Sequence, residues 1–312
     1  MLRLEDLTLS YERSRLPIVE ELSLSVAPGE IVALVGESGC GKSLTGLSIL
    51  GLLPPGIVPT KGRVFFGPHD LLSLSEEELR RFRGGRIAMI FQDPMTALNP
   101  VFTVGFQIVE ALSLHRGLSG TQAREEAIRL LAEVGIPAPQ ERFFSYPHEL
   151  SGGMRQRVMI AMALAGEPEL LIADEPTTAL DVTIQAQILE LLRELREKKG
   201  LSILLISHDL GVVAELADRV AVMYAGRLVE EAEVKTLYHA PLHPYTQALL
   251  KALPGPEKKA LFAIPGRVPP PGERLLGCKF SDRCPEAQKI CFEEEPSLKA
   301  RGKDHRVRCH QR

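Results

Sequence analysis

A short glycine-rich stretch near the N-terminus constrains this chain more than any other feature. Its sequence is GESGCGKS, residues 36–43, and it directly follows the apolar run IVALV. Such a run is typical of a strand buried on both faces of a parallel sheet. A strand that leads through G-x-x-x-x-G-K-[ST] into a helix is the pattern of a phosphate-binding P-loop. The sequence therefore predicts an α/β core built around a phosphate site.

The residues of this loop have distinct expected roles. Backbone N–H groups around the glycines would face the β-phosphate of a nucleotide. Lys42 would reach the β- and γ-phosphates, and the Ser43 hydroxyl would hold Mg²⁺. We expect the whole loop to bind the nucleotide: Gly36, Glu37, Ser38, Gly39, Cys40, Gly41, Lys42 and Ser43.

Two adjacent carboxylates lie at the end of a second apolar strand, LLIAD, about 130 residues after the loop. Asp174 would lie at the carboxyl end of this strand, close to Mg²⁺. Glu175 would project in another direction and is suited to orient or deprotonate an attacking water. Together with the loop, this pair predicts nucleotide hydrolysis.

Further motifs complete a recognisable order. In LSGGMRQRVMIAMAL, residues 150–164, the segment SGG begins a helix, where N–H groups bind anions without a cationic side chain. Gln92 lies in IFQDP, Asp181 in TALD and His208 in LISHD. In this order and spacing the motifs closely resemble those of ATP-binding cassette (ABC) ATPases. The resemblance covers roughly residues 2–252.

In ABC ATPases two cassettes dimerise head to tail, so that each ATP is held by the P-loop of one and the signature of the other. The resemblance implies that Tyr11 stacks on adenine. The catalytic residues would be Glu175, His208, Lys42 and Gln92. Mg²⁺ would be held by Ser43, Gln92 and Asp174. The ATP of the partner cassette would be contacted by Ser151, Gly152, Gly153 and Asp181.

The resemblance also implies the domain organisation. Residues 1–252 would form an ABC-type P-loop α/β domain with an antiparallel β subdomain and a helical subdomain inserted at about residues 93–165. Residues 253–312 would form an irregular extension rich in proline and cysteine.

Local signals predict the ends of several helices. Ser75 and Glu78 form a capping box, and Thr121 is a candidate N-cap of a helix that ends before Gly135. Ile184, Ile188, Leu191, Leu192 and Leu195 share one stripe of a helix that Gly200 would end.

Several stretches narrow the resemblance to ATP-binding subunits of oligopeptide/dipeptide importers. They are FQDPMTALNPVFTVG, LSGGMRQRVMIAMAL, HPYTQALL and the tail IPGRVPPPG followed by GCKFSDRCP. Met154 stands where the wider family usually has Gln, but SGGM is common in this group. The resemblance implies an ATPase of peptide uptake at the cytoplasmic face of the cell membrane. Its partners would be a second ABC ATPase subunit, identical or different, two transmembrane permeases and an extracytoplasmic substrate-binding protein.

Other functions would use similar motifs. Importers of nickel chelates or other small solutes belong to the same group, so the solute stays open. A soluble ABC ATPase of DNA repair or translation tends to carry a long coiled coil before the signature, or two cassettes. Here that interval is about a hundred residues without sustained heptads, and one P-loop is present. The net charge of −3, with both signs interspersed, argues against nucleic acid as a partner.

Four of the five cysteines lie in the C-terminal extension. They are Cys278, Cys284, Cys291 and Cys309. No apolar run is long enough to span a bilayer and no secretory signal is visible, so we expect a cytosolic chain. There, clustered cysteines are more often metal ligands than disulfides. The spacing fits neither the tight pairs of zinc sites nor the common ferredoxin run, and leaves the kind of metal undecided.

The resemblance bears on these cysteines too. Some peptide-importer ATPases resemble this chain in a C-terminal quartet of this spacing that binds a [4Fe–4S] cluster. The resemblance therefore implies such a cluster here, with Zn²⁺ as the alternative. His305 and His310 are possible replacements for one cysteine in a zinc site.

Overall fold

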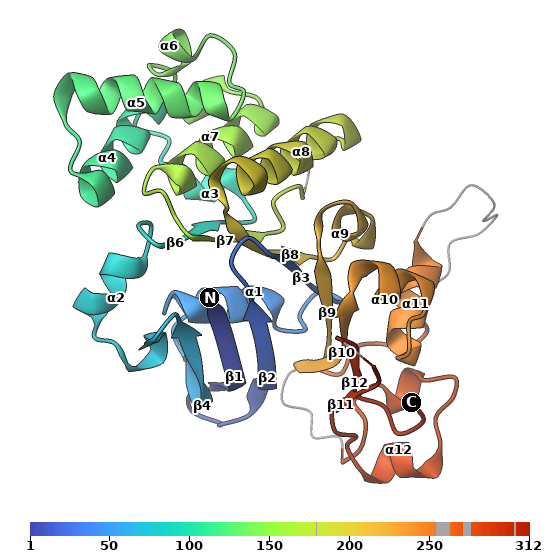
Figure 1. Cartoon of the computed structure of the whole chain (residues 1–312). Coiled ribbons are helices and arrows are strands. Elements are labelled where there is room, and N and C mark those ends of the chain that lie inside the picture. Colours follow the sequence, from blue (N-terminus) through green and yellow to red (C-terminus); the bar gives the residue numbers. More distant parts are fainter. Residues whose placement is uncertain (179, 254–262, 271–275, 303) are drawn as a thin grey trace. The chain divides into compact units, whose positions relative to one another are not determined.

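The computed structural model describes the chain except for residues 179, 254–262, 271–275 and 303. Its contacts divide the chain into two compact units (Figure 1). The first unit joins two separate stretches, Met1–Ser73 and Leu205–Arg312, and the second is the continuous stretch Leu74–Leu204. No described helix is long and apolar enough to cross a membrane.

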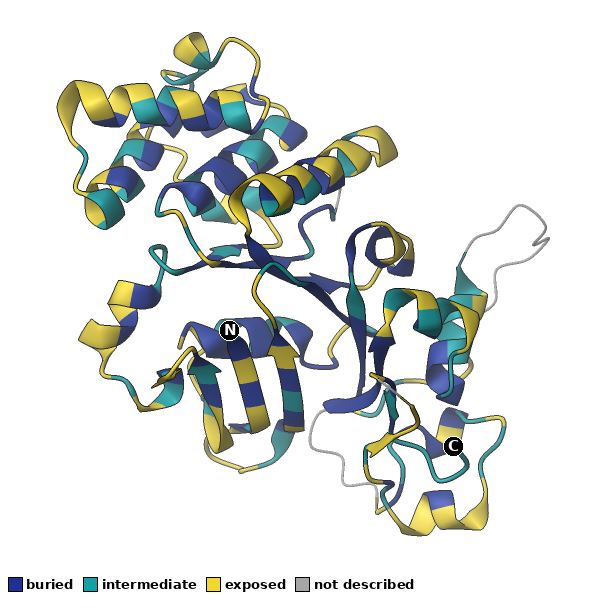
Figure 2. Cartoon of the chain, viewed as in Figure 1, coloured by how far each residue is buried: buried dark blue, intermediate teal, exposed yellow. Residues whose placement is uncertain are grey.

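The first unit contains an antiparallel sheet with the strand order β2-β1-β4-β5. Its strands are β1 (Leu2–Tyr11), β2 (Pro17–Val26), β4 (Ile57–Phe66) and β5 (His69–Asp70). Along β1 the leucines are buried while Arg3 and Glu5 are exposed, so one face of the sheet is apolar (Figure 2).

The first unit also holds strands of a second sheet, in the order β11-β12-β10-β9-β3. These are β3 (Ile31–Val35), β9 (Arg219–Tyr224), β10 (Arg227–Glu233), β11 (Lys299–Ala300) and β12 (Arg306–Val307). All five residues of β3 are buried, as the apolar run predicted, and β3 pairs in parallel with β9. The strand β8 (Ser202–Ser207) crosses the division between the units.

Short helices accompany these strands. They are α1 (Lys42–Ile49), η1 (Leu71–Ser73), α9 (Leu210–Leu216), α10 (Val234–His239), α11 (Pro244–Ala252), η3 (Ser281–Arg283) and α12 (Lys289–Glu293). The helix α1 starts at the lysine of the P-loop, so the strand–loop–helix order expected for that motif is present.

The second unit combines a parallel strand pair with helices. Its strands β6 (Ile87–Ile90) and β7 (Leu170–Asp174) are parallel neighbours. Its helices are α2 (Glu76–Phe82), α3 (Pro94–Ala97), α4 (Val104–Arg116), α5 (Gly120–Glu133), α6 (Pro139–Arg142), η2 (Pro147–Glu149), α7 (Gly152–Leu164) and α8 (Val182–Lys199). The helices α4, α5 and α7 pack against one another.

The helix ends test the local signals. The capping box of Ser75 and Glu78 is present at α2, and Gly200 ends α8 with a left-handed backbone. The N-cap predicted at Thr121 is wrong, because the extended backbone that precedes α5 lies at Ser119 and the helix starts at Gly120. Gly135 follows the end of that helix as expected, with φ of +75°.

Charged side chains bind the C-terminal extension to the rest of the first unit. Arg227 of β10, itself buried, forms an ion pair of 2.7 Å with Glu295. His305 lies 2.8 Å from the fully buried Glu230. The Nε of Arg306 donates to Glu231 over 2.9 Å. An aromatic anchor, Phe280, adds apolar contact with Tyr224 and Tyr245.

We expect this anchor to matter for stability. Phe280 is 2% exposed, whereas Phe292 of the same extension is 49% exposed. Replacing Phe280 by alanine should cost about 3–5 kcal/mol of unfolding free energy, because it leaves a cavity in the aromatic cluster. Phe292→Ala should change it by less than about 0.5 kcal/mol. Urea unfolding of the full chain measures both, and equal losses would show that Phe280 is no anchor.

Candidate functional site

The backbone of the P-loop passes so close to its neighbours that two positions require glycine. A Cβ on Gly36 would lie 2.2 Å from the carbonyl oxygen of Met223 in β9. A Cβ on Gly41 would lie 2.5 Å from a methyl group of Val19, and its φ of +102° is left-handed. The loop is therefore fitted against β2 and β9 by the absence of side chains.

The lysine of the loop is buried and turns back on the loop itself. Its Nζ donates to the carbonyl of Gly36 over 2.8 Å and to that of Glu37 over 3.2 Å. Ser43 is the next residue, in the first turn of α1. Cys40 is buried too, and burial raises the pKa of its thiol, so this cysteine is unsuited to act as a nucleophile.

Two residues that were not predicted as site residues also contact the loop. The hydroxyl of Tyr245 in α11 accepts the backbone N–H of Glu37 over 2.9 Å. The guanidinium of Arg283 in η3 forms an ion pair of 2.8 Å with the Glu37 carboxylate. Arg283 is 246 residues from Glu37 in the chain, so no local pattern could have predicted the contact.

The second unit brings together two of the predicted catalytic residues. Glu175 directly follows β7, and its Oε2 accepts hydrogen bonds of 2.9 Å from Gln92 Nε2 and of 2.9 Å from Thr178 Oγ1. This meeting follows from the parallel pairing of β6 and β7, whose carboxyl ends lie at the same edge. Thr178 lies in the TALD stretch, but the motif itself pointed only to Asp181.

The backbone of Glu175 has φ of +48°, in the left-handed region that is costly for a residue with a side chain. Asp174, the last residue of β7, is 5% exposed. The strand thus ends with one buried carboxylate and one that a strained backbone turns toward Gln92. This difference in direction is the one that adjacent positions predicted.

The signature residues start α7, as expected. Ser151 is its N-cap, and the side chain accepts the N–H of Met154 over 3.3 Å. Gly152 and Gly153 form the first turn, and a Cβ on Gly153 would lie 2.7 Å from a methyl group of Ile184 in α8. Asp181 is the N-cap of α8 and accepts the N–H of Ile184 over 3.0 Å.

The remaining predicted residues belong to the first unit. Tyr11 ends β1 and is 39% exposed, which leaves part of its ring open to solvent. His208 follows β8 and is exposed. The loop residues, Tyr11 and His208 thus belong to the first unit, and Gln92, Asp174, Glu175 and the signature to the second.

The cysteines of the extension are described in full and form no disulfide. The backbone N–H of Cys278 donates to the carbonyl of Cys291 over 2.8 Å. Burial first, and then the charges of the three other cysteines, raise the pKa of Cys278 to about 11, so the four thiols share one electrostatic neighbourhood.

The expected metal site is not supported by the side-chain arrangement. Within the described ranges, no group of three or more His, Cys, Asp or Glu side chains could hold a metal ion. The two histidines considered as alternative ligands have other partners, Glu230 for His305 and the carbonyl of Glu294 for His310.

Comparison with protein families and solved structures agrees with this geometry. Residues 19–178 match the family model of ABC transporters, and residues 229–291 match that of the C-terminal region of oligopeptide/dipeptide transporters. The dimeric structure of the ATP-binding cassette MJ0796 bound to ADP and Pi has a TM-score of 0.67 at 30% identity. It covers 75% of this chain and 99% of that one.

Two relatives are similar over almost the whole chain. The dipeptide transport ATP-binding protein DppD of Escherichia coli is 50% identical over 315 residues, which cover 99% of this chain and 96% of that protein. DppD of Bacillus subtilis is 52% identical over 299 residues, which cover 93% and 88%. The chain therefore belongs to the ABC transporter family, in the group of ATP-binding subunits of oligopeptide and dipeptide transporters.

Proposed function

We propose that this chain hydrolyses ATP to drive the uptake of di- or oligopeptides through a membrane transporter. The observation that carries the hydrolytic role is the hydrogen-bonded Glu175, held by Gln92 and Thr178 at the end of β7. A carboxylate held in this way is prepared to accept a proton from water. The choice of peptides as the transported solute rests on the near full-length similarity to dipeptide transport proteins.

In this proposal the predicted site residues of the chain serve one nucleotide. Lys42 leaves the loop carbonyls for the phosphates, Tyr11 stacks on adenine, and His208 lies near the γ-phosphate. Glu175 accepts the proton of the attacking water, and Gln92 keeps this carboxylate oriented. Asp174 and Ser43 offer the oxygen ligands that Mg²⁺ prefers, and bound Mg²⁺ would neutralise phosphate charge.

The signature would act on the nucleotide of a second cassette. The first turn of α7 begins with two glycines, Gly152 and Gly153, so the N–H groups of these two residues are not covered by side chains of their own. Ser151, Gly153 and Asp181 would contact the partner's ATP and close the dimer only while ATP is bound. The second cassette would be identical or different.

A surface of the second unit supports a role beside permeases. Large apolar side chains are exposed on and near α3, α4 and α6: Phe91, Met95, Val101, Phe102, Phe106, Phe144 and Tyr146. Phe102 and Phe106 stack with centroids 4.7 Å apart. Clustered exposed aromatics mark interaction sites. We place the contact with one of the two transmembrane permeases here, within the helical subdomain of residues 93–165, at the cytoplasmic face of the membrane. An extracytoplasmic binding protein would deliver the peptide.

The four C-terminal cysteines stay within the proposal. The resemblance to peptide-importer ATPases with such a quartet supports a [4Fe–4S] cluster, and the backbone hydrogen bond from Cys278 to Cys291 brings two of the four residues side by side. A cluster held by Cys278, Cys284, Cys291 and Cys309 would tie the extension together.

Glu175→Gln tests the hydrolytic role. The substitution keeps the shape of the side chain but removes the proton acceptor. We expect ATP affinity to stay within about twofold and turnover to fall about a hundredfold or more. Glu197→Gln, an exposed change in α8, is the matched control. Phosphate release measures turnover, and a variant that keeps most of its activity would show that Glu175 is not the base.

Charge introduced into the aromatic surface tests the permease contact. Phe102→Asp with Phe106→Asp should leave ATP binding by the isolated subunit unchanged, because neither residue belongs to the nucleotide site. Co-purification with permeases and peptide uptake should both be lost. Leu276→Asp, at an apolar residue of the extension that is even more exposed, is the control and should have no effect. Normal uptake by the double variant would place the permease contact elsewhere.

Metal analysis tests the cluster. Protein purified without oxygen should absorb near 400 nm and contain iron and sulfide, and Cys284→Ser should lose both signals. Removal of the metal by a chelator should lower the melting temperature of the protein, because the extension would lose its cross-link. Colourless protein that contains zinc would replace the cluster by the alternative metal, and protein without either would leave the cysteines as thiols.

A further inference from the structure

The C-terminal extension sends one charged side chain to the P-loop. Arg283 forms a two-pronged ion pair with Glu37, with Nη1 2.8 Å from Oε2 and Nη2 3.0 Å from Oε1. The arginine side chain is 4% exposed and the glutamate side chain 29%. A bidentate pair of this kind is both strong and specific in geometry.

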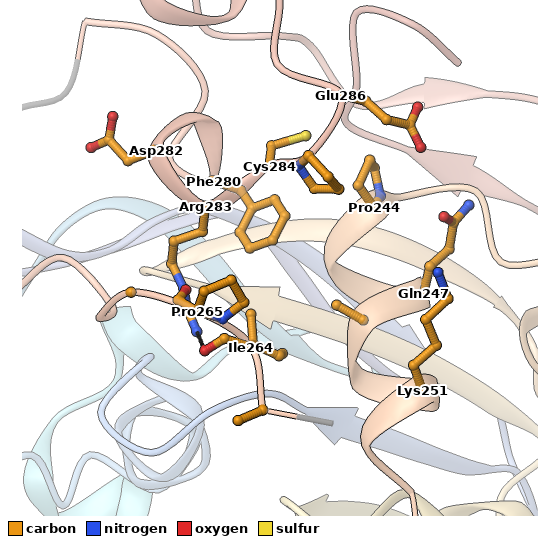
Figure 3. Close-up of a pocket in the computed structure, with 14 residues that line it drawn as sticks. Pro244, Gln247, Lys251, Ile264, Pro265, Phe280, Asp282, Arg283, Cys284 and Glu286 are labelled. Atoms are coloured by element: carbon orange, nitrogen blue, oxygen red, sulfur yellow. Dashed lines mark hydrogen bonds between the residues drawn. The ribbon is translucent and has the colours of Figure 1, made fainter. Parts of the chain in front are cut away.

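Every nitrogen of this guanidinium has an acceptor. Nε donates to the carbonyl of Pro265 over 2.8 Å, and Nη2 also reaches that of Ile264 at 3.4 Å (Figure 3). Nη1 also donates to the Tyr224 hydroxyl over 3.2 Å. Burial by itself would lower the pKa of Arg283, but the hydrogen bonds to Glu37 and Tyr224 raise it above the ordinary value. The guanidinium is thus held in one position and stays protonated at any working pH.

Glu37 connects Arg283 to the phosphate-binding lysine, because both residues contact it. Its carboxylate is held by Arg283, its N–H by the Tyr245 hydroxyl, and its carbonyl accepts from Lys42 Nζ. Two of the three contacts come from residues beyond position 244. The loop segment that borders Lys42 therefore takes its position from the C-terminal part of the chain.

A second buried arginine, Arg227, contacts the extension without contacting the P-loop. Arg227 lies in β10 and contacts the extension through Glu295, and it pairs with Glu20 and Glu21 of β2. None of these carboxylates belongs to the P-loop. Arg283 and Arg227 are thus alike in burial and charge, but Arg283 alone of the two contacts the loop.

We propose that Arg283 is a positioning residue for ATP binding, which sets the P-loop through Glu37 and so makes nucleotide affinity depend on the C-terminal extension. The inference rests on the proposed role of the loop in holding ATP. It predicts that loss of the pair weakens binding itself and does not only destabilise the fold.

The surroundings of Arg283 allow it to be replaced. It lines a cavity of about 530 Å³ together with Phe280, Cys284, Pro265 and Gln247 (Figure 3). A side chain of equal or smaller size at position 283 therefore meets no close-packed neighbour on that side. Arg283→Gln and Arg283→Lys should both fold.

The experiment compares the full-length chain with Arg283→Gln, Arg283→Lys, Glu37→Gln, the double variant Arg283→Gln/Glu37→Gln, and the control Arg227→Gln. The Kd of a fluorescent ATP analogue and the melting temperature are measured for each. We expect Arg283→Gln to raise Kd about tenfold, within the usual range of coupling between two sites. Arg227→Gln should lower the melting temperature but leave Kd within about twofold of wild type.

The other variants decide whether the pair acts as a unit. Arg283→Lys keeps the charge but loses the fork, so its Kd should lie between wild type and Arg283→Gln. The double variant should bind no more weakly than the weaker single variant.

If Arg283→Gln binds as well as Arg227→Gln, or if the two losses add, the positioning role is wrong. If wild type binds no nucleotide at all, the proposed function fails first, which is a different result. A failure of Arg283→Gln to fold leaves the comparison of Arg283→Lys with Arg227→Gln to decide.

Discussion

The parallel pairing of β3 with β9 is the constraint on which the rest of the first unit depends. It sets Val35 opposite Val222, one residue before each strand reaches the region of the P-loop. The Met223 carbonyl then occupies the space that a Cβ on Gly36 would need. The course of the loop is thus fixed by a strand that lies almost two hundred residues later in the chain. The next residue of that strand, Tyr224, begins the aromatic cluster with Tyr245 and Phe280.

Sequence patterns predict those parts of the structure that interactions between neighbouring residues determine. The apolar run of β3, the capping box at Ser75 and the stop at Gly200 are each determined by neighbours in the chain, and all three were predictable. Thr121 failed because another capping residue, Ser119, stands two positions earlier and takes the extended backbone. The contacts of Arg283 and Thr178 depend on where distant strands end, and no period or cap encodes that. Their residue types carried no signal of their own.

The site residues divide in the same way. Gln92 and Glu175 meet because two parallel strands end together, although Gln92 was expected at the site only from the order of motifs. The roles of Tyr11, His208 and the signature came only from the order of motifs, since each residue has an ordinary use in a turn or cap. The cysteine spacing could not name a metal, because sulfur geometry depends on the folded backbone and not on the count of residues between ligands.

The discontinuity of the first unit has a consequence for how the protein is made. A ribosome releases the chain from its N-terminus, so Leu74–Leu204 is complete while the first unit still lacks more than half of its residues, Leu205–Arg312. The P-loop emerges early and must wait for β9, then for Tyr245, and finally for Arg283. A nascent or truncated chain therefore carries the phosphate motif long before its loop has all its supports. If Arg283 positions the loop as proposed, tight binding of nucleotide requires that nearly the entire subunit has been synthesised.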